Sequence, residues 1–423
     1  MIFSYDDYFE EFLYLYENDE DINGNTNAVC RFLKHKYNVA KGLEAMRKAF
    51  SDRLNNHYAD KEIVEQNVIL AKQKQKAQDK NRIANKSFRE HARLENALSE
   101  FSEAQLKIYK EHAKALKKIK LKPLHKTLND GIGVMQITDL HGNELVDLPN
   151  NKYDFNVMAK RLKLYVSQCI EDFKIRKYEK VAMLFTGDLL NSDRRLDELL
   201  NASTNRAKAT SLMRYILSQV ILDVRNSGFE ITIVSVLGNE SRVGKEMPFS
   251  NEGLSDNYDF MIMDGIRQMF NMSGIKGINF KSLDKVEEII EIDGRDWLIS
   301  HNISRIVDNQ KNAQSGIGRQ SLNGHNVSFM IGGHIHATNV GDFYARSSSL
   351  VGSNSYSENA LNLAGRAAQN YYLCSNGRIN TVVVDLQDIS NVEGYNVIQE
   401  LEAYNAKSVS KLDIPKTVFK VVI

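Results

Sequence analysis

The segment IGVMQITDLH, from Ile132 to His141, decides how this sequence is interpreted. Its mostly apolar first part, 132–137, predicts a buried β-strand, and Asp139 and His141 follow where that strand would end. Because the two polar residues are two positions apart, both side chains can point the same way in an extended chain. Loops at strand ends are where α/β proteins build their sites. The segment therefore predicts a strand-end site containing a carboxylate and an imidazole.

Four more segments have the same design, a short apolar run followed by polar residues. They are Thr186-Gly187-Asp188 after 181–185, Gly238-Asn239-Glu240 after 231–237, Ser300-His301 after 297–299, and Gly332-Gly333-His334-Ile335-His336 after 328–331. A sixth apolar run covers 381–384, and helix-like segments cover 155–177 and 205–226. Apolar runs that alternate with helical segments predict an α/β domain.

The polar residues of these segments form one set of candidate metal ligands: Asp139, His141, Asp188, Asn239, His301, His334 and His336. The set holds oxygen and nitrogen donors and no thiolate, which suits Mn²⁺, Mg²⁺, Fe²⁺ or Zn²⁺. Seven ligands are too many for one tetrahedral ion, whereas two ions that share a bridging carboxylate can use them all. Two such ions can clamp both oxygens of a phosphoryl displacement, in which a metal-bridged hydroxide attacks phosphorus in line.

The order and spacing of these motifs resemble the calcineurin-like metallophosphoesterase superfamily, over roughly residues 131–350. The resemblance implies a double β-sheet sandwich flanked by helices. It also implies two divalent ions, with Mn²⁺ preferred, and a role for each ligand. One ion would be held by Asp139, His141 and His336, the other by Asn239, His301 and His334, and Asp188 would bridge the two.

One residue departs from the family pattern. The family usually has a histidine after the asparagine of its third motif, where it protonates the leaving group or stabilises the transition state, and this chain has Glu240. Four interpretations follow: Glu240 donates the proton itself, another group does, Glu240 is inert and water supplies the proton, or catalysis is weak. Substrate phosphate would be met by Arg242, Arg194, Arg195 and Asn143, although each of these also fits a solvated surface position.

The first part of the chain differs from the rest in its content of proline and glycine. Residues 43–122 contain neither Pro nor Gly, which predicts a long helix ending before Pro123. We expect a helical module at 1–60, a long basic helix or coiled-coil linker at 61–126, and the catalytic domain at 127–423. A heptad seam of Leu94, Leu98, Phe101 and Ile108 favours the coiled coil, through which the chain would form a homodimer or contact a partner subunit.

Within the first module, residues 26–54 resemble a helix-turn-helix with its turn at 37–39. Ala28, Phe32 and Leu33 would pack against Leu43, Met46 and Phe50. A DNA backbone would then meet Lys41, Arg47, Lys48 and Arg53. Any small helical hairpin has this pattern, so a plain packing module is the alternative.

The overall charge of +1 hides a segregation of charge along the chain. Residues 61–126 hold 17 Lys and Arg against 8 Asp and Glu, whereas residues 127–423 hold 31 against 35. The overall balance excludes a uniformly basic DNA-coating protein. The basic stretch fits attraction to nucleic acid and equally fits the solvated face of a coiled-coil arm, which is slightly favoured. No run of 18 apolar residues occurs, the first residues do not resemble a secretory signal, and Cys30, Cys169 and Cys374 are scattered. These features predict no membrane association and a cytoplasmic protein, in the host cytoplasm if a phage encodes it.

Together the motifs predict a two-metal-dependent phosphodiester hydrolase, a nuclease acting on DNA as an exo- or endonuclease. The helical extension and the Glu after the Asn resemble phage-encoded, repair-exonuclease-like proteins of the same superfamily. One alternative is a phosphatase or phosphodiesterase acting on nucleotides, proteins or small phosphoesters, because the superfamily hosts all of these. Another is a DNA-binding protein whose catalytic site is impaired at Glu240.

Overall fold

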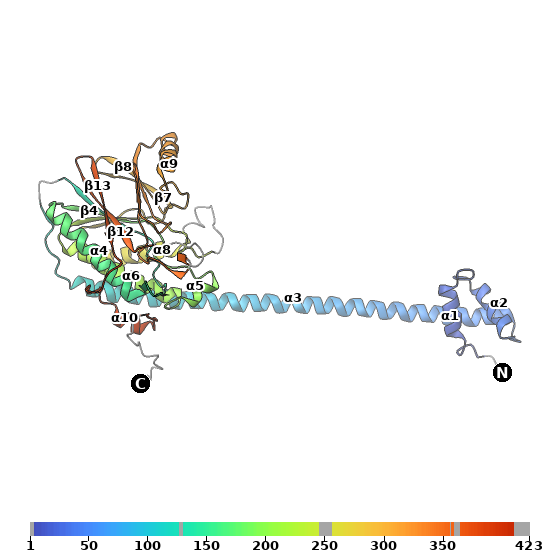
Figure 1. The fold of residues 1–423 in the computed structure, drawn as a ribbon. Coiled ribbons are helices and arrows are strands. Elements are labelled where there is room, and N and C mark those ends of the chain that lie inside the picture. The colour runs from blue at the N-terminus through green and yellow to red at the C-terminus, as the bar shows by residue number, and fades with distance from the viewer. Residues whose placement is uncertain (1–3, 127–129, 245–255, 356, 359–363, 410–423) are drawn as a thin grey trace, which may run out of the picture. The chain divides into compact units, whose positions relative to one another are not determined.

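The computed structural model describes residues 4–126, 130–244, 256–355, 357–358 and 364–409, except for the side chains of 60–65 and of several α3 residues between 87 and 104. Contacts along the chain divide it into two compact units, Met1–Ala104 and Gln105–Ile423. Figure 1 shows a helical first unit and a second unit built of strands and helices.

The first unit consists of α1 (Phe9–Asn18), α2 (Thr26–Lys36) and most of α3 (Leu43–Lys117). The two helices predicted around the turn at 37–39 are present, and Leu33, Met46 and Phe50 are buried as predicted. The prediction for Phe32 was wrong, because 46% of its surface is exposed. The buried face of α2 is formed instead by Val29, Cys30 and Leu33, since α1 also packs on this helix and contributes Phe12.

The long helix α3 begins at Leu43 and ends at Lys117, five residues before the predicted end at 122. Its last turns belong to the second unit, where Tyr109, Ala113 and Leu116 are buried. The division at 104/105 therefore lies earlier than the boundary expected at 126/127, because Tyr109 and Leu116 join the larger core. The side chains of Leu94, Leu98 and Phe101 lie outside the described residues, so the coiled coil stays a prediction.

The second unit contains a six-stranded sheet in the order β13-β12-β1-β4-β5-β6. Strands β1, β4, β5 and β6 are parallel, and β12 and β13 extend the sheet antiparallel beyond β1. Ile137, the last residue of β1, is paired with Phe185, the last residue of β4, so the loops that follow both strands leave the same edge. The strands are β1 (Ile132–Ile137), β4 (Lys180–Phe185), β5 (Glu230–Ser235), β6 (Ile278–Phe280), β12 (Ala368–Ser375) and β13 (Arg378–Asp385).

A second sheet has five strands in the order β10-β11-β9-β8-β7. Strands β8, β9 and β11 are parallel, and β7 and β10 are antiparallel to their neighbours. The strands are β7 (Glu287–Ile292), β8 (Arg295–Ser300), β9 (Val327–Gly332), β10 (Asn339–Val340) and β11 (Tyr344–Arg346), and a separate pair is formed by β2 (Val146–Asp147) and β3 (Lys152–Tyr153).

The two sheets pack face to face, because alternate residues of each strand point into a shared apolar layer. Val134 and Leu184 of the first sheet share this layer with Trp297 and Phe329 of the second. The other face of the first sheet is covered by α4, α6 and α8, and α9 packs on the second sheet. The helices of the unit are α4 (Phe155–Ile175), α5 (Leu196–Leu200), α6 (Arg206–Asn226), α8 (Tyr258–Ser273), α9 (Gln310–Leu322) and α10 (Ile398–Ala403).

This architecture confirms the predicted α/β fold, a two-sheet sandwich flanked by helices and preceded by an all-α region. Each of the six apolar runs lies mainly or wholly within a strand, and both helix-like segments are helices.

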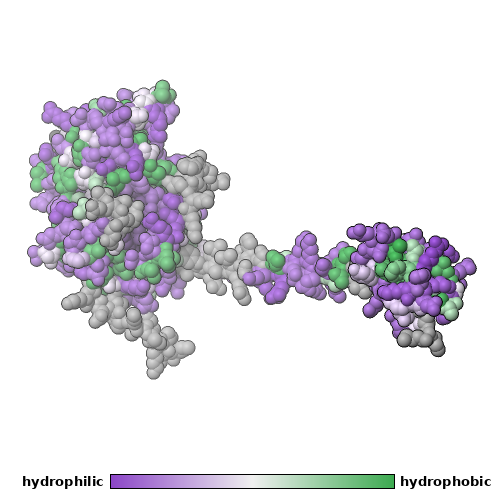
Figure 2. All heavy atoms as spheres, turned by 45° about the vertical axis from the view of Figure 1, so that its right-hand side comes forward, coloured by the Kyte–Doolittle hydropathy of each residue, from purple (hydrophilic) through white to green (hydrophobic). Residues whose placement is uncertain are grey.

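Cys30, Cys169 and Cys374 are buried free thiols. Among the described residues, no helix combines the length and apolar character needed to cross a membrane. Figure 2 shows mainly hydrophilic residues on the face it presents, with hydrophobic ones scattered between them.

Candidate metal centre

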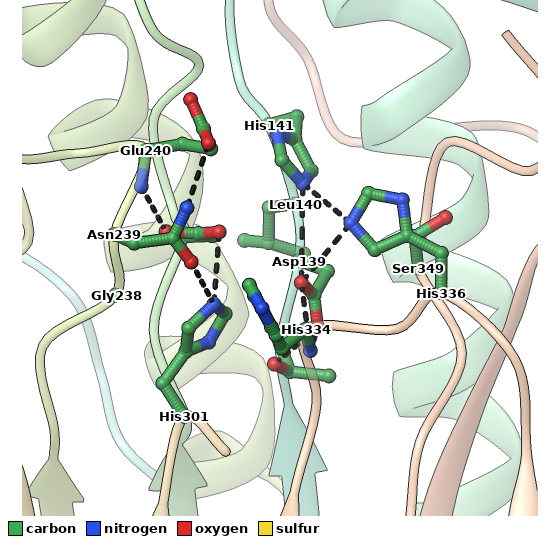
Figure 3. A network of polar contacts seen from close by, with 12 residues as sticks. Asp139, Leu140, His141, Gly238, Asn239, Glu240, His301, His334, His336 and Ser349 are labelled. Carbon is green, nitrogen blue, oxygen red and sulfur yellow. Dashed lines mark hydrogen bonds and ion pairs between the residues drawn. The ribbon is translucent and has the colours of Figure 1, made fainter. Parts of the chain in front are cut away.

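The candidate ligands lie on five loops that meet at one end of the sandwich. Strands β1, β4 and β5 are parallel neighbours, so the loops that carry Asp139, Asp188 and Asn239 leave the first sheet at one edge. Strands β8 and β9 are parallel neighbours in the second sheet and deliver His301 and His334. The sandwich brings these two edges together, as Figure 3 shows. A site thus assembles from residues up to 197 positions apart, between Asp139 and His336.

The backbone at most of these ligands adopts the left-handed conformation, which non-glycine residues rarely occupy. Such strain, of order 1–3 kcal/mol a residue, persists only where the surroundings hold it, and it clusters at functional sites. Here the backbone N–H of His334 donates to Oδ2 of Asp139 at 3.0 Å, and that of Glu240 donates to Oδ1 of Asp188 at 2.7 Å. The φ angles are +48° at Asp139, +43° at His141, +54° at Asp188, +75° at His334 and +55° at His336.

The first group of candidate ligands consists of Asp139, His141 and His336. The Nε2 atoms of the two imidazoles lie 3.0 Å apart. Oδ1 of Asp139 lies 3.2 Å from Nε2 of His336 and 3.9 Å from that of His141. Three ligand atoms that point at one small space match the demand of a single metal ion.

The second group consists of Asp188, His301 and His334, whose ligand atoms all lie within 4.8 Å of one another. Nε2 of His301 lies 2.9 Å from Oδ2 of Asp188 and 3.1 Å from Oδ1 of Asn239. Asp188 and His301 are almost completely buried, so water does not screen this cluster. The amide oxygen of Asn239 adds a fourth donor of the kind a hard cation accepts.

Two of the imidazoles are oriented through their other ring nitrogen. Nδ1 of His141 lies 3.1 Å from Oδ1 of Asn191, and Nδ1 of His301 lies 2.8 Å from the carbonyl oxygen of Thr186. Because both partners are acceptors, each Nδ1 carries the proton, which leaves Nε2 of the neutral ring free to bind a metal. Metal-binding histidines usually have such a partner.

The electrostatics of the site favour positive charge. Burial lowers the pKa of His301, but the nearby carboxylate of Asp188 outweighs it and raises the pKa to about 9. Burial likewise opposes the charge on His141, whereas its contact with Asp139 raises the pKa to about 10. His334 differs, since burial and the charge of His301 lower its pKa to about 4. The carboxylates of Asp139 and Asp188 stabilise positive charge on the neighbouring imidazoles and would stabilise bound cations in the same way. The donor set therefore fits two divalent ions.

Glu240, the departure from the family pattern, is held by two donors. Its Oε2 is paired with Nη2 of Arg194 at 3.0 Å, and its Oε1 accepts from Nδ2 of Asn239 at 2.7 Å. Its carbonyl oxygen accepts from Arg194 at 3.1 Å and from Arg206 at 2.6 Å. Arg242 donates to the carbonyl of Asn239 at 2.8 Å. Of the predicted phosphate contacts, Arg194 and Arg242 therefore lie beside the metal centre.

The other two predicted substrate contacts have different partners. Both polar atoms of the Asn143 side chain bond the backbone of Thr204, at 2.9 and 2.8 Å. Arg195 pairs with Glu198 of α5 at 2.6 Å. The side-chain amide of Asn143 thus fixes a loop, and its assignment to substrate stays a prediction. Arg195 faces α5, which its position beside Arg194 in the sequence did not indicate.

The predicted nucleic-acid contacts belong to the first unit. Arg53 is paired with Asp6 at 2.8 Å, and Nζ of Lys41 lies 4.6 Å from the ring centre of Tyr5. Arg47 and Lys48 are exposed on α3. Arg53 and Lys41 thus contact residues near the start of the chain, and the binding of nucleic acid by this unit stays a prediction.

Sequence reasoning missed the residues that support the ligands. Among them are Asn191, Asn257 and Asp259, of which Asp259 is completely buried. Burial, with the charge of Asp188 adding to it, raises the pKa of Asp259 to about 6. A helix N-cap signature marks Asn257, which precedes an amphipathic segment. No local sequence pattern identifies Asp259 as a hydrogen-bond partner of Asp188, which lies 71 positions away.

Comparisons with known proteins give structural likenesses only. No family model and no curated protein matches the sequence. A predicted phosphoesterase from Streptococcus pneumoniae is 10% identical, with 62% of this chain and 92% of that chain covered and a TM-score of 0.26. Vps29 from Entamoeba histolytica, complexed with zinc, is 13% identical over 60% of this chain and 99% of that one, with a TM-score of 0.26. A 5'-nucleotidase from Staphylococcus aureus, described as putative, is 12% identical over 64% of this chain and 57% of that one, with a TM-score of 0.34.

Proposed function

We propose that this protein is a two-metal-dependent phosphoester hydrolase and, within that class, a nuclease that cleaves phosphodiester bonds of DNA. The observation that carries the proposal is the pair of ligand groups, Asp139, His141 and His336 beside Asp188, His301 and His334. Asn239 contacts the second group. Two-metal centres of carboxylate and imidazole ligands are typical of phosphate-ester hydrolysis.

The roles of the residues follow from their contacts. Asp139, His141 and His336 would hold one ion, and Asn239, His301 and His334 the other, with Asp188 between them. Divalent ions in such a centre polarise a phosphoryl oxygen and lower the pKa of bound water to about 7. Asn191 and the Thr186 carbonyl keep two imidazoles in the binding tautomer. Arg194 and Arg242 lie beside the centre and would add positive charge for a phosphate, with Arg194 sharing its charge with Glu240.

Glu240 does not act as the proton donor in this proposal. Donors from Arg194 and Asn239 point at its two carboxylate oxygens, so both oxygens act as acceptors. A group in that state cannot supply a proton to a leaving oxygen. In this proposal water protonates the leaving group, and Glu240 holds Arg194 and Asn239 in place.

The charge pattern supports a nucleic acid as the substrate, and we propose that it is DNA. Residues 61–126 carry 17 basic against 8 acidic side chains, whereas residues 127–423 carry 31 against 35. A mildly acidic catalytic unit would hold a polyanion poorly through its overall charge. Basic residues of the helical region would supply that attraction through the release of counterions.

A substrate screen in Mn²⁺ tests the proposal. The substrates are p-nitrophenyl phosphate, its bis ester, single-stranded DNA, duplex DNA and RNA, and Asp188→Asn serves as the inactive control. We expect cleavage of DNA and of the bis ester that Asp188→Asn abolishes. Hydrolysis of small esters without any polynucleotide would favour the phosphatase or phosphodiesterase alternative. Salt-dependent DNA binding without hydrolysis of any substrate would favour a DNA-binding protein with an impaired site.

A further inference from the structure

The carboxylate of Asp259 joins two loops of the metal centre from behind. Asp259 is the second residue of α8, and its side chain is completely buried. Its Oδ1 accepts the backbone N–H of Leu189 at 2.9 Å. Its Oδ2 accepts those of Asp188 at 3.0 Å and Gly238 at 2.9 Å. One carboxylate therefore bonds the loop after β4 and the loop after β5.

Asn257, the N-cap of the same helix, completes this connection. Its Oδ1 accepts the backbone N–H of Asp259 at 2.9 Å, which fixes the first turn of α8. Its Nδ2 donates to the carbonyl oxygen of Gly238 at 2.9 Å. The start of α8 thus binds both backbone polar groups of Gly238, the residue directly before Asn239.

The two loops need such a restraint because they approach unusually closely. A Cβ on Gly238 would lie 2.2 Å from the backbone nitrogen of Asp188, and one on Gly187 would lie 2.7 Å from that of Gly238. Asp188 also has a φ of +54°, in the left-handed region. A strained residue keeps such a conformation only when several contacts hold it. The bonds from Asp259 to Asp188 and Leu189 are contacts of that kind.

We propose that Asp259 is a positioning residue that sets the spacing of Asp188 and Asn239 and so controls binding of the second metal ion. The inference rests on the proposed two-metal function. The hydrogen bonds of Asp259 reach the loops after β4 and β5, which carry Asp188 and Asn239. Asp188 is shared by both ions in the proposed centre, whereas Asn239 contacts only the second group. Asp139, His141 and His336 lie on the loops after β1 and β9. Loss of Asp259 therefore weakens the second ion more than the first.

The test is Mn²⁺ binding by the full chain with Asp259→Asn. Asparagine has a single acceptor oxygen, and its NH₂ would face backbone N–H groups, so the loops lose at least one restraint. Calorimetry should give two ions for the wild type, and electron paramagnetic resonance should give the spectrum of a spin-coupled pair. In the variant we expect the second ion to bind roughly 10–100-fold more weakly, as for other residues that orient ligands. At one equivalent of Mn²⁺ its spectrum should show isolated ions.

Asp264→Asn is the matched control, because it makes the same change on the same helix. Asp264 bonds Arg267 at 2.9 Å and Gln268 at 2.6 Å, and this variant should bind both ions like the wild type. If circular dichroism shows that Asp259→Asn does not fold, Mn²⁺ binding is measured on Asn257→Asp instead. It keeps a good N-cap but loses the donor to Gly238, so the second ion should again bind more weakly.

The outcomes separate this inference from the proposed function. A wild type that binds fewer than two ions contradicts the proposed function, and the inference falls with it. If the wild type binds two ions and the folded Asp259→Asn protein binds both with unchanged affinity and a coupled spectrum, only the role of Asp259 is overturned. If Asp259→Asn is unfolded, the Asn257→Asp protein is used instead. Binding of the second Mn²⁺ ion by Asn257→Asp with wild-type affinity would likewise overturn the role of Asp259.

Discussion

The side-chain amide of Asn239 donates from Nδ2 to Oε1 of Glu240 at 2.7 Å, so its Oδ1 turns toward Nε2 of His301, 3.1 Å away. The same glutamate accepts from Arg194 at 3.0 Å. A residue that occupies the position of a proton donor in the resembled family thus orients a candidate ligand here. The arrangement explains how a glutamate at this position is compatible with an intact set of ligands.

Replacing Glu240 by alanine should therefore impair activity by disordering Asn239. Residues that orient metal ligands typically contribute roughly 10–100-fold to activity, and we expect a loss of that size in Mn²⁺-dependent hydrolysis of bis-p-nitrophenyl phosphate. Glu240→Gln retains an acceptor oxygen for Asn239 and should recover part of the loss. Glu287→Ala removes a surface partner of Arg319 and is the control. Equal rates for the Ala and Gln variants would contradict the role in orientation.

The stabilisation of the protein by Mn²⁺ should increase with pH. In the metal-free protein Asp188 raises the pKa of His301 to about 9, against the effect of burial. The folded state then binds more protons than the unfolded state between about pH 6.5 and 9, so the stability that this group contributes is full below 6.5 and is lost as the pH rises to 9. Metal ions bind the deprotonated ring, and their stabilising effect grows over the same window.

Melting temperatures in EDTA and in excess Mn²⁺, from pH 6 to 9.5, measure this effect. The difference between the two conditions should widen steadily with pH for the wild type. It should be small at every pH for Asp188→Asn, which lacks the carboxylate. A difference of constant size in the wild type would show that protons and metal ions do not compete at this centre.

Replacing Gly238 by alanine should destabilise the protein and remove its activity together. The added Cβ would lie 2.1 Å from Oδ1 of Asp188, so the two loops must separate. Overpacking of this kind costs about 1–3 kcal/mol. Gly318→Ala in α9 is the control, because nothing lies within 4 Å of its added Cβ. Since alanine favours a helix over glycine, the free energy of unfolding should rise by about 0.5–1 kcal/mol. Chemical denaturation and the rate of bis-ester hydrolysis measure both effects, and a fully active Gly238→Ala protein would contradict the close packing of the loops.

If the first unit binds DNA, exchanging Arg47 and Lys48 for glutamate should weaken binding. Both side chains are exposed on α3. Each lost phosphate contact lowers the dependence of affinity on salt by about one unit in a double-logarithmic plot, so the slope should fall by about two. Lys174 and Lys311, exposed on the second unit, provide a control with the same change of charge. Fluorescence anisotropy gives the slopes, and equal slopes for the two double variants would argue against a DNA contact at Arg47 and Lys48.

The strands, and the gathering of the candidate ligands at one place, could be predicted because their signals are local. An apolar run followed directly by Asp139 and His141 marks a strand and the residues that leave its end, and five such segments indicate a single site. The supporting residues were not predictable in this way. Asp259 acts on backbone N–H groups of loops 21 and 71 positions away, and a backbone donor leaves no trace in the sequence.

The helical region shows the same limit. The absence of Pro and Gly predicted α3, since helix propensity is a local property. Which face of α2 is buried depends on α1, a partner that periodicity alone did not identify, and the expected role of Phe32 was wrong for that reason. The division at 104/105 depends likewise on Tyr109 and Leu116 finding partners in the second unit.

The most direct test of the two-metal account is the rate of bis-p-nitrophenyl phosphate hydrolysis by wild type and Asp188→Asn, measured with the number of Mn²⁺ ions bound per chain. The account predicts two bound ions and steady turnover in the wild type, and turnover no faster than the EDTA control in Asp188→Asn. Equal turnover in both proteins, or a wild type that binds two ions and hydrolyses no phosphoester, would contradict it.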